Sequence, residues 1–273
     1  MKRVLVLLLA AAMLLSGCEW SLKAFLERME EYKKAETAVT TEPVEPFVPE
    51  TTEPQVPETT EPHVPEHSSL YIPGLAVEDV ILYFNEVVLD AEYVSGGDPG
   101  KLQKWDKPIY YVIHGSFTRK DLEVLEDFVT FLNTIEGFPG MFETEDPTMV
   151  NLQIHFCSRE QLINIMGPNF VGMDGGVTFW YDGLDRIYEG TICYCTEIDQ
   201  TVRNSVILEE IYNGLGPAQD TDLRTDSIIY AGYSEPQELT QIDELLLRLL
   251  YHPSMKCGMD REECEAVIRS LYY

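Results

Sequence analysis

Hydrophobic and polar positions follow two different periods along residues 70–273. Apolar residues recur every three or four positions in six segments, which predicts helices over residues 76–89, 119–136, 158–166, 199–215, 240–251 and from 260 onward. Runs of β-branched and aromatic residues predict strands over residues 109–115, 150–156, 175–181 and 187–195. Because these strands precede or interleave with long helices, we expect an α+β fold with a mixed sheet.

Polar residues mark where several of these helices begin. Thr118 is followed three residues later by Asp121, and Thr240 by Asp243, which is the spacing of a capping box. Asp260 is suited to open the last helix. These residues therefore predict where three of the helices begin.

The N-terminus has the pattern of an export signal. Lys2 and Arg3 precede an apolar run, residues 4–15, that is too short to span a bilayer. The run ends in Leu-Ser-Gly-Cys at Cys18, which resembles a bacterial lipoprotein processing site. We therefore expect residues 1–17 to be a lipoprotein signal peptide, and Cys18 to carry palmitate and other lipid on the extracytoplasmic face of the bacterial cell membrane. Ordinary secretion, with Cys18 uninvolved, is the alternative.

Two low-complexity segments separate this anchor from the domain. Residues 18–36 have apolar positions at helical spacing, which fits either an amphipathic helix on the membrane or a frayed tether. Residues 37–69 repeat threonine, glutamate and proline, which predicts an extended, polyproline-like linker. Residues 70–273 would then form one domain with its own core.

The charge of the chain limits its partners. It has 19 basic and 47 acidic residues, for a net charge of −28. Such a charge would repel a phosphate backbone, so we expect no nucleic acid partner. It is compatible with a cationic partner or simply with a solvated acidic surface.

Five cysteines follow Cys18, so at least one stays unpaired within a monomer. Cys193 and Cys195 are two apart in a predicted strand and are poorly placed to bridge each other. Cys257 and Cys264 flank a helix start and could form a disulfide. None of the spacings is that of a cysteine metal site.

The helix predicted over residues 199–215 carries the candidate site. Residues 209–219, at its C-terminal end, align with the zinc-peptidase pattern H-E-x-x-H-x-x-G-x-x-H. Glu210 takes the place of the general base and Gly216 that of the glycine. Glu209, Asn213 and Gln219 take the places of the three zinc ligands.

Two resemblances follow from these residues. Residues 74–273 resemble an uncharacterised family of secreted bacterial proteins, a domain of unknown function, through the following marks: Tyr83-Phe84, Lys104-Trp105, Glu209-Glu210, Leu215-Gly216, Asp220, Ser227-Ile228, Leu239-Thr240, Asp243 to Leu246, Leu250-Tyr251 and Gly258-Met259. The helix, its glycine turn and Ser-Ile-Ile-Tyr at 227–230 are more distantly similar to metzincins, with Ile229 in place of the turn methionine. This resemblance implies a zincin-like fold that lacks every zinc histidine.

The residue types argue against zinc peptidase chemistry. Asn213 and Gln219 offer neutral amides, which are poor zinc ligands, and the histidines of the domain, at 114, 155 and 252, are scattered. We therefore predict no metal and no cofactor. The favoured hypothesis is a non-catalytic domain that binds an extracytoplasmic peptide, glycan or protein. The alternative is a hydrolase that uses Glu210, with Glu209 beside it, as a catalytic acid or base with an atypical metal site or none.

Overall fold

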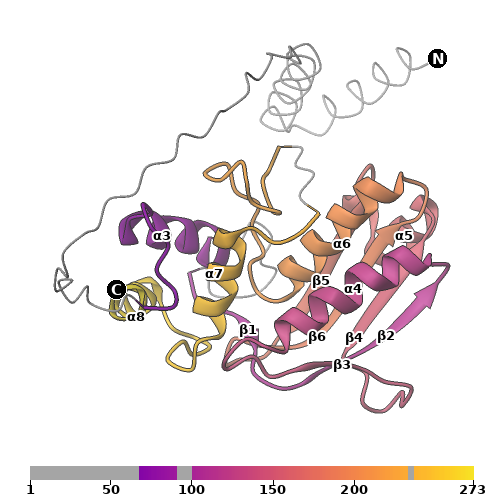
Figure 1. The fold of residues 1–273 in the computed structure, drawn as a ribbon. Coiled ribbons are helices and arrows are strands. Elements are labelled where there is room, and N and C mark those ends of the chain that lie inside the picture. The colour runs from indigo at the N-terminus through magenta and orange to yellow at the C-terminus, as the bar shows by residue number, and fades with distance from the viewer. Residues whose placement is uncertain (1–67, 91–99, 233–236) are drawn as a thin grey trace, which may run out of the picture. The chain divides into compact units, whose positions relative to one another are not determined.

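Figure 1 shows a computed structural model that describes residues 68–90, 100–232 and 237–273. The predicted signal peptide, Cys18, the tether and the linker up to residue 67 lie outside the described residues. The described residues all fall within one compact unit. None of their helices is long and apolar enough to cross a membrane.

The centre of the fold is a mostly parallel sheet. Its strands are β1 (Lys104–Trp105), β2 (Ile109–Gly115), β3 (Met141–Glu143), β4 (Leu152–Cys157), β5 (Gly175–Tyr181) and β6 (Arg186–Cys195). The order is β1-β6-β4-β2-β3, with every pair parallel, and β5 pairs antiparallel with β6. The four predicted strands are confirmed. β1 and β3 are too short to show a period, so the sequence did not predict them.

All six predicted helices are present. They are α3 (Val77–Phe84), which continues as the π-helix η1 (Asn85–Leu89), and α4 (Arg119–Leu132), α5 (Arg159–Met166), α6 (Gln200–Gly214), α7 (Gln241–Tyr251) and α8 (Arg261–Tyr272). A short 3-10 helix, η2 (Pro168–Phe170), follows α5. The predicted capping boxes at Thr118 and Thr240 are confirmed, and Asp260 caps α8 in the same way.

α4 ends four residues earlier than predicted. At its end, Asn133 donates to the carbonyl of Met141 (3.0 Å) and accepts from the amide of Met141 (2.8 Å). This side chain therefore pairs with β3 and turns the chain towards the sheet. The helical period of residues 119–136 does not reveal a stop that depends on a contact with another strand.

The helices cover the two faces of the sheet differently. α4 and α6 lie side by side over one face, and α5 lies on the other (Figure 1). Ile154 and Ile192 belong to the main core, while Cys157 and Cys193 pack in a separate small cluster with Leu162 of α5. α6, which carries the candidate site, is therefore held between the sheet and its neighbouring helices.

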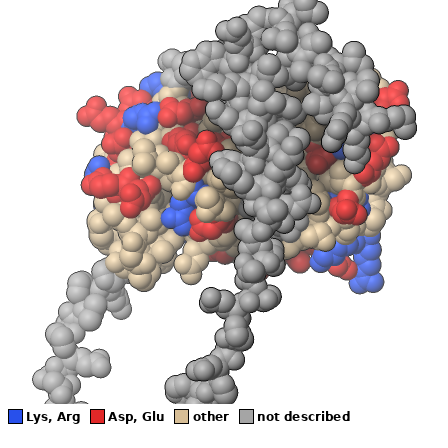
Figure 2. All heavy atoms as spheres, turned by 90° about the horizontal axis from the view of Figure 1, so that it is seen from above, with Lys and Arg blue, Asp and Glu red and all other residues tan. Residues whose placement is uncertain are grey.

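The described surface is predominantly acidic but mixed. Acidic side chains are spread over the visible part of the face in Figure 2, with basic side chains among them. Several basic residues pair with acids, such as Arg119 with Glu123 and Arg269 with Glu78. The visible part of this face therefore lacks the continuous basic stripe that is typical of a nucleic acid interface.

Candidate functional site at the end of helix α6

α6 lies very close to the antiparallel strand β5. A Cβ added at Gly175 of β5 would lie 2.4 Å from Val206 Cγ1 and 2.7 Å from Glu210 Oε1. Glycine is therefore required here for the approach of the helix. The contact shows that Glu210 faces the sheet, between α6 and β5, and not solvent.

The turn after α6 also depends on glycine. Gly216 has φ +132°, and a Cβ there would lie 2.6 Å from the carbonyl oxygen of Gln103. Both the backbone conformation and the close approach exclude a larger residue. Gly216, the glycine of the peptidase-like pattern, therefore allows the chain to turn sharply after α6.

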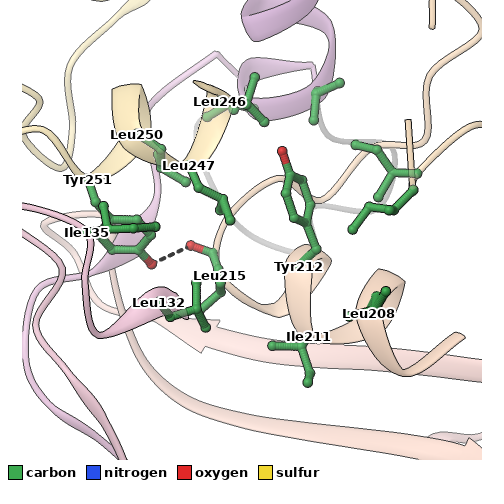
Figure 3. Packing of buried hydrophobic residues seen from close by; sticks show 14 of the residues in the cluster. Leu132, Ile135, Leu208, Ile211, Tyr212, Leu215, Leu246, Leu247, Leu250 and Tyr251 are labelled. Atoms are coloured by element: carbon green, nitrogen blue, oxygen red, sulfur yellow. Dashed lines mark hydrogen bonds between the residues drawn. The ribbon is translucent and has the colours of Figure 1, made fainter. Parts of the chain in front are cut away.

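Helix α7 and strand β1 hold the C-terminal end of α6. The Tyr251 hydroxyl donates to the Leu215 carbonyl at 2.7 Å, as the dashed line in Figure 3 shows. Tyr212 donates to the carbonyl of Asp243 (3.0 Å), and Trp105 Nε1 donates to that of Gly214 (2.8 Å). The bonds to Gly214 and Leu215 satisfy carbonyl groups that the end of α6 would otherwise leave unpaired, and the bond to Asp243 ties α6 to α7.

We expect Tyr251→Phe to lower the free energy of unfolding by about 1–3 kcal/mol, because it leaves the buried Leu215 carbonyl without a donor. Urea unfolding followed by circular dichroism would measure the change. Tyr188→Phe is the matched control, since Tyr188 is about half exposed and should change stability by less than about 0.5 kcal/mol. Equal effects of the two substitutions would show that the Tyr251 hydroxyl does not support the helix end.

Residues 227–230 form a turn that is tied to α7. The buried Ser227 hydroxyl donates to Asp243 Oδ1 (2.7 Å) and accepts from the amide of Ile229 (3.2 Å). Tyr83 of α3 is hydrogen-bonded to the same hydroxyl at 2.9 Å. Tyr83, Ser227 and Asp243, far apart in the sequence, thus form one buried network.

The two glutamates of α6 lie in different surroundings. Glu210 is only 9% exposed, whereas Glu209 is half-buried. Burial, with the nearby charges of Asp220 and Asp174, raises the pKa of Glu209 to about 8. Burial and the charges of Glu209 and Asp220 raise the pKa of Glu210 well above its usual range. Both shifts favour the protonated form of these side chains.

Neither carboxyl group is paired with a positive charge. Within the part of the chain that the structure describes, Glu209 and Glu210 form no ion pair and receive no hydrogen bond from a side chain or backbone group. This explains why burial dominates both pKa shifts.

The other two predicted ligand positions also hold unsatisfied oxygens. Asn213 Oδ1 and Gln219 Oε1 are buried, and neither has a hydrogen-bond partner among the described residues. Both residues are half-buried, as Glu209 is. The positions that the sequence pattern assigned to zinc ligands are thus occupied by oxygen acceptors without donors.

The histidines lie elsewhere. His114 of β2 and His155 of β4 pair in register, and their rings stack with centroids 4.7 Å apart. Burial and the neighbouring His114 lower the pKa of His155. These residues are scattered along the sequence, and no linear spacing reveals a contact between neighbouring strands. His252 follows the end of α7.

The described residues do not fit a zinc centre. They contain no group of three or more His, Cys, Asp or Glu side chains placed to hold a metal ion. Glu209 is the one residue of a usual zinc-ligand type among the three predicted positions. The structure thus offers no set of imidazoles or thiolates for zinc at α6.

The cysteine prediction requires a correction. All five cysteines of the described residues are free, so the disulfide suggested for Cys257 and Cys264 is not formed. The Cys257 thiol lies 3.6 Å from the Lys104 carbonyl, while Cys264 is buried on the inner face of α8. Instead, the Cys157 and Cys193 thiols are hydrogen-bonded across neighbouring strands.

A protein family matches most of the folded region. The model of a family described as "Protein of unknown function (DUF2927)" matches residues 78–270, which include every helix named above except the ends of α3 and α8. No curated protein matches the chain.

Proposed function

We propose a binding role rather than a catalytic one for this chain, which belongs to the family described as "Protein of unknown function (DUF2927)". In this proposal, the protein is a lipoprotein held at the extracytoplasmic face of the membrane through Cys18. Its domain is a zincin-like domain without zinc, and it binds a peptide segment in extended form.

The order of elements supports a zincin-like relationship. A strand (β2), a helix (α4), further strands, the long helix α6, the turn at 227–230 and the closing helix α7 follow one another as in that class. The buried contacts of Ser227 and Gly216 support the structural equivalence of the turn and the helix end. The missing histidines separate the chain from the peptidases of that class.

The observation that carries the binding role is the open edge of β5. β6 pairs with one side of β5, and no described strand pairs with the other. An extended peptide can add to such an edge through main-chain hydrogen bonds. Because α6 packs beside Gly175 and Val177 of β5, a peptide there would run close to the end of α6.

The burial of Glu210 argues against hydrolysis. A general base must reach the water or proton that it acts on. Glu210 is instead packed against β5, where its carboxyl oxygen comes within 2.7 Å of a Cβ built at Gly175. A hydrolase remains the second candidate, because the raised pKa of both glutamates is the property that a general acid needs at neutral pH.

The test uses the full chain with a library of short extended peptides. We expect binding without cleavage, together with slower hydrogen exchange of the amides of β5 (Gly175–Tyr181), measured by mass spectrometry. Glu210→Gln should leave both results unchanged. Peptide fragments that appear with the native chain and disappear with Glu210→Gln would establish the hydrolase. Binding without protection of β5 would exclude this edge as the binding site.

Anchoring is tested separately. We expect the native chain to incorporate labelled palmitate and to sediment with bacterial membranes, and Cys18→Ala to lose both properties. Cys257→Ala is the control, since its thiol lies within the folded domain and should retain the label. Labelling of Cys18→Ala at the native level would contradict the anchor.

A further inference from the structure

We propose that Glu209, Asn213 and Gln219 form a binding site for a divalent cation that prefers oxygen ligands, and that calcium is the best occupant. This inference goes beyond the proposed peptide-binding role and does not depend on it. It follows from the burial, the chemistry and the positions of these three side chains.

The first observation is a pair of buried acceptors without donors. The amide oxygens of Asn213 and Gln219 are buried without a partner in the described structure. Buried polar atoms are nearly always hydrogen-bonded, and an unsatisfied one costs about 1–3 kcal/mol. Asn213 lies one helical turn beyond Glu209, so a positively charged occupant there would give its oxygen and the Glu209 carboxyl group a shared partner.

The second observation is the placement of the three residues. Glu209 and Asn213 are four residues apart on α6, so they lie one above the other on the same face of the helix. Gly216 has φ +132° in the turn that follows α6, and Gln219 comes three residues after it. The charge of Asp220, the residue after Gln219, contributes to the raised pKa of both Glu209 and Glu210.

The ligand types select the class of ion. Carboxylate and amide oxygens suit calcium, magnesium and manganese, whereas zinc in proteins is usually held by imidazole and thiolate groups. Magnesium demands a near-ideal octahedron, while calcium accepts irregular sets of carboxylate and amide oxygens at about 2.3–2.6 Å. One carboxylate with two neutral amides therefore fits calcium best.

A metal ion fits better than the ammonium group of a larger ligand. Both amide oxygens are out of contact with solvent, so a peptide side chain would have to open the fold to reach them. A bare ion needs contacts of only about 2.3–2.6 Å. A site with a single strong carboxylate should bind weakly, with a dissociation constant on the order of 10⁻⁴–10⁻³ M, as in extracellular calcium modules.

The experiment is a calcium titration of the full chain after removal of metal with a chelator. Calorimetry should give one calcium ion per chain, and saturation should raise the unfolding temperature. We expect Glu209→Gln to abolish binding, and Asn213→Leu and Gln219→Met each to weaken it at least tenfold. Glu160→Gln, at an exposed carboxyl of α5, is the matched control and should bind calcium as the native chain does.

A second measurement separates lost binding from lost folding. In chelator, Asn213→Leu should unfold at the same or a higher urea concentration than the native chain, because it removes an unsatisfied buried oxygen. The proposal is overturned if no saturable calcium binding occurs up to about 10 mM, tenfold beyond the weakest affinity of this class. Unchanged affinity in both amide variants, or tighter binding of zinc than of calcium, would also overturn it. So would stabilisation by a lysine-rich peptide but by no metal ion.

Discussion

Replacing Arg203 by methionine is expected to lower the free energy of unfolding by about 3–5 kcal/mol. Arg203 Nε donates to Asp121 Oδ1 at 2.8 Å, and the two side chains are 6% and 0% exposed. The guanidinium also donates to the carbonyls of Thr196 and Ile198 and to Gln200. The substitution would leave the Asp121 carboxylate buried without its counter-ion, between the starts of α4 and α6.

Urea unfolding of the native chain and the variant at neutral pH measures this effect. Arg269→Met is the matched control, because Arg269 forms an equally short pair with Glu78 (2.7 Å), but one in which both side chains are about half exposed. Exposed pairs contribute about 0–1 kcal/mol, so the control should be nearly neutral. Similar losses in the two variants would show that burial does not set the strength of the Arg203 contact.

The second large effect concerns pH. The pKa of Glu209 is raised to about 8 by burial, whereas in the unfolded chain it returns to its ordinary value near 4.5. Between these two values the unfolded state ionises while the folded state still holds the proton. Folding stability should therefore be greatest below about pH 4.5 for this group and should fall as the pH rises towards 8. Glu210 acts in the same direction.

Glu209→Gln removes this dependence, so it should stabilise the protein at pH 8 and leave it almost unchanged at pH 5. The full pKa shift of Glu209 would correspond to a gain in the free energy of unfolding of about 5 kcal/mol at pH 8. Because water screens the half-buried side chain, we expect a smaller gain of about 1–2 kcal/mol. Unfolding in urea, with chelator present, measures the gain at both pH values. The control Glu160→Gln should follow the native profile. A gain at pH 5 equal to that at pH 8 would contradict the raised pKa of Glu209.

The pH effect and the proposed calcium site involve the same carboxyl group, that of Glu209. Without a cation, burial favours the protonated form of Glu209 and Glu210. Calcium requires an ionised Glu209, so its binding should release a proton and reduce the loss of stability at pH 8. The site would then respond to both pH and calcium.

Features that depend on neighbouring residues in the chain were predictable from the sequence. A capping box needs only a helix start and the residue three positions later, so Thr118 and Thr240 could be assigned without a structure. The helices and the four longer strands show their periods over many residues. The general class, α+β with a mixed sheet, follows from their order and is confirmed.

Features that depend on packing were not predictable. β1 and β3 exist because longer elements hold short segments in register, and α4 stops because Asn133 pairs with β3. The stacking of His114 and His155 follows from the register of β2 and β4. The pairing suggested for Cys257 and Cys264 is not formed, although the charge of Lys104 acts on both thiols.

The candidate site depends both on the local sequence and on tertiary packing. The chain alone placed Glu209, Asn213 and Gln219 on one pattern and showed that their side chains are unsuited to zinc. It could not show how deeply they are buried, since burial arises when Gly175 admits α6 to β5 and Tyr251 of α7 binds the helix end. Side-chain chemistry is a property of the sequence, whereas desolvation and the absence of donors arise only when distant segments pack together.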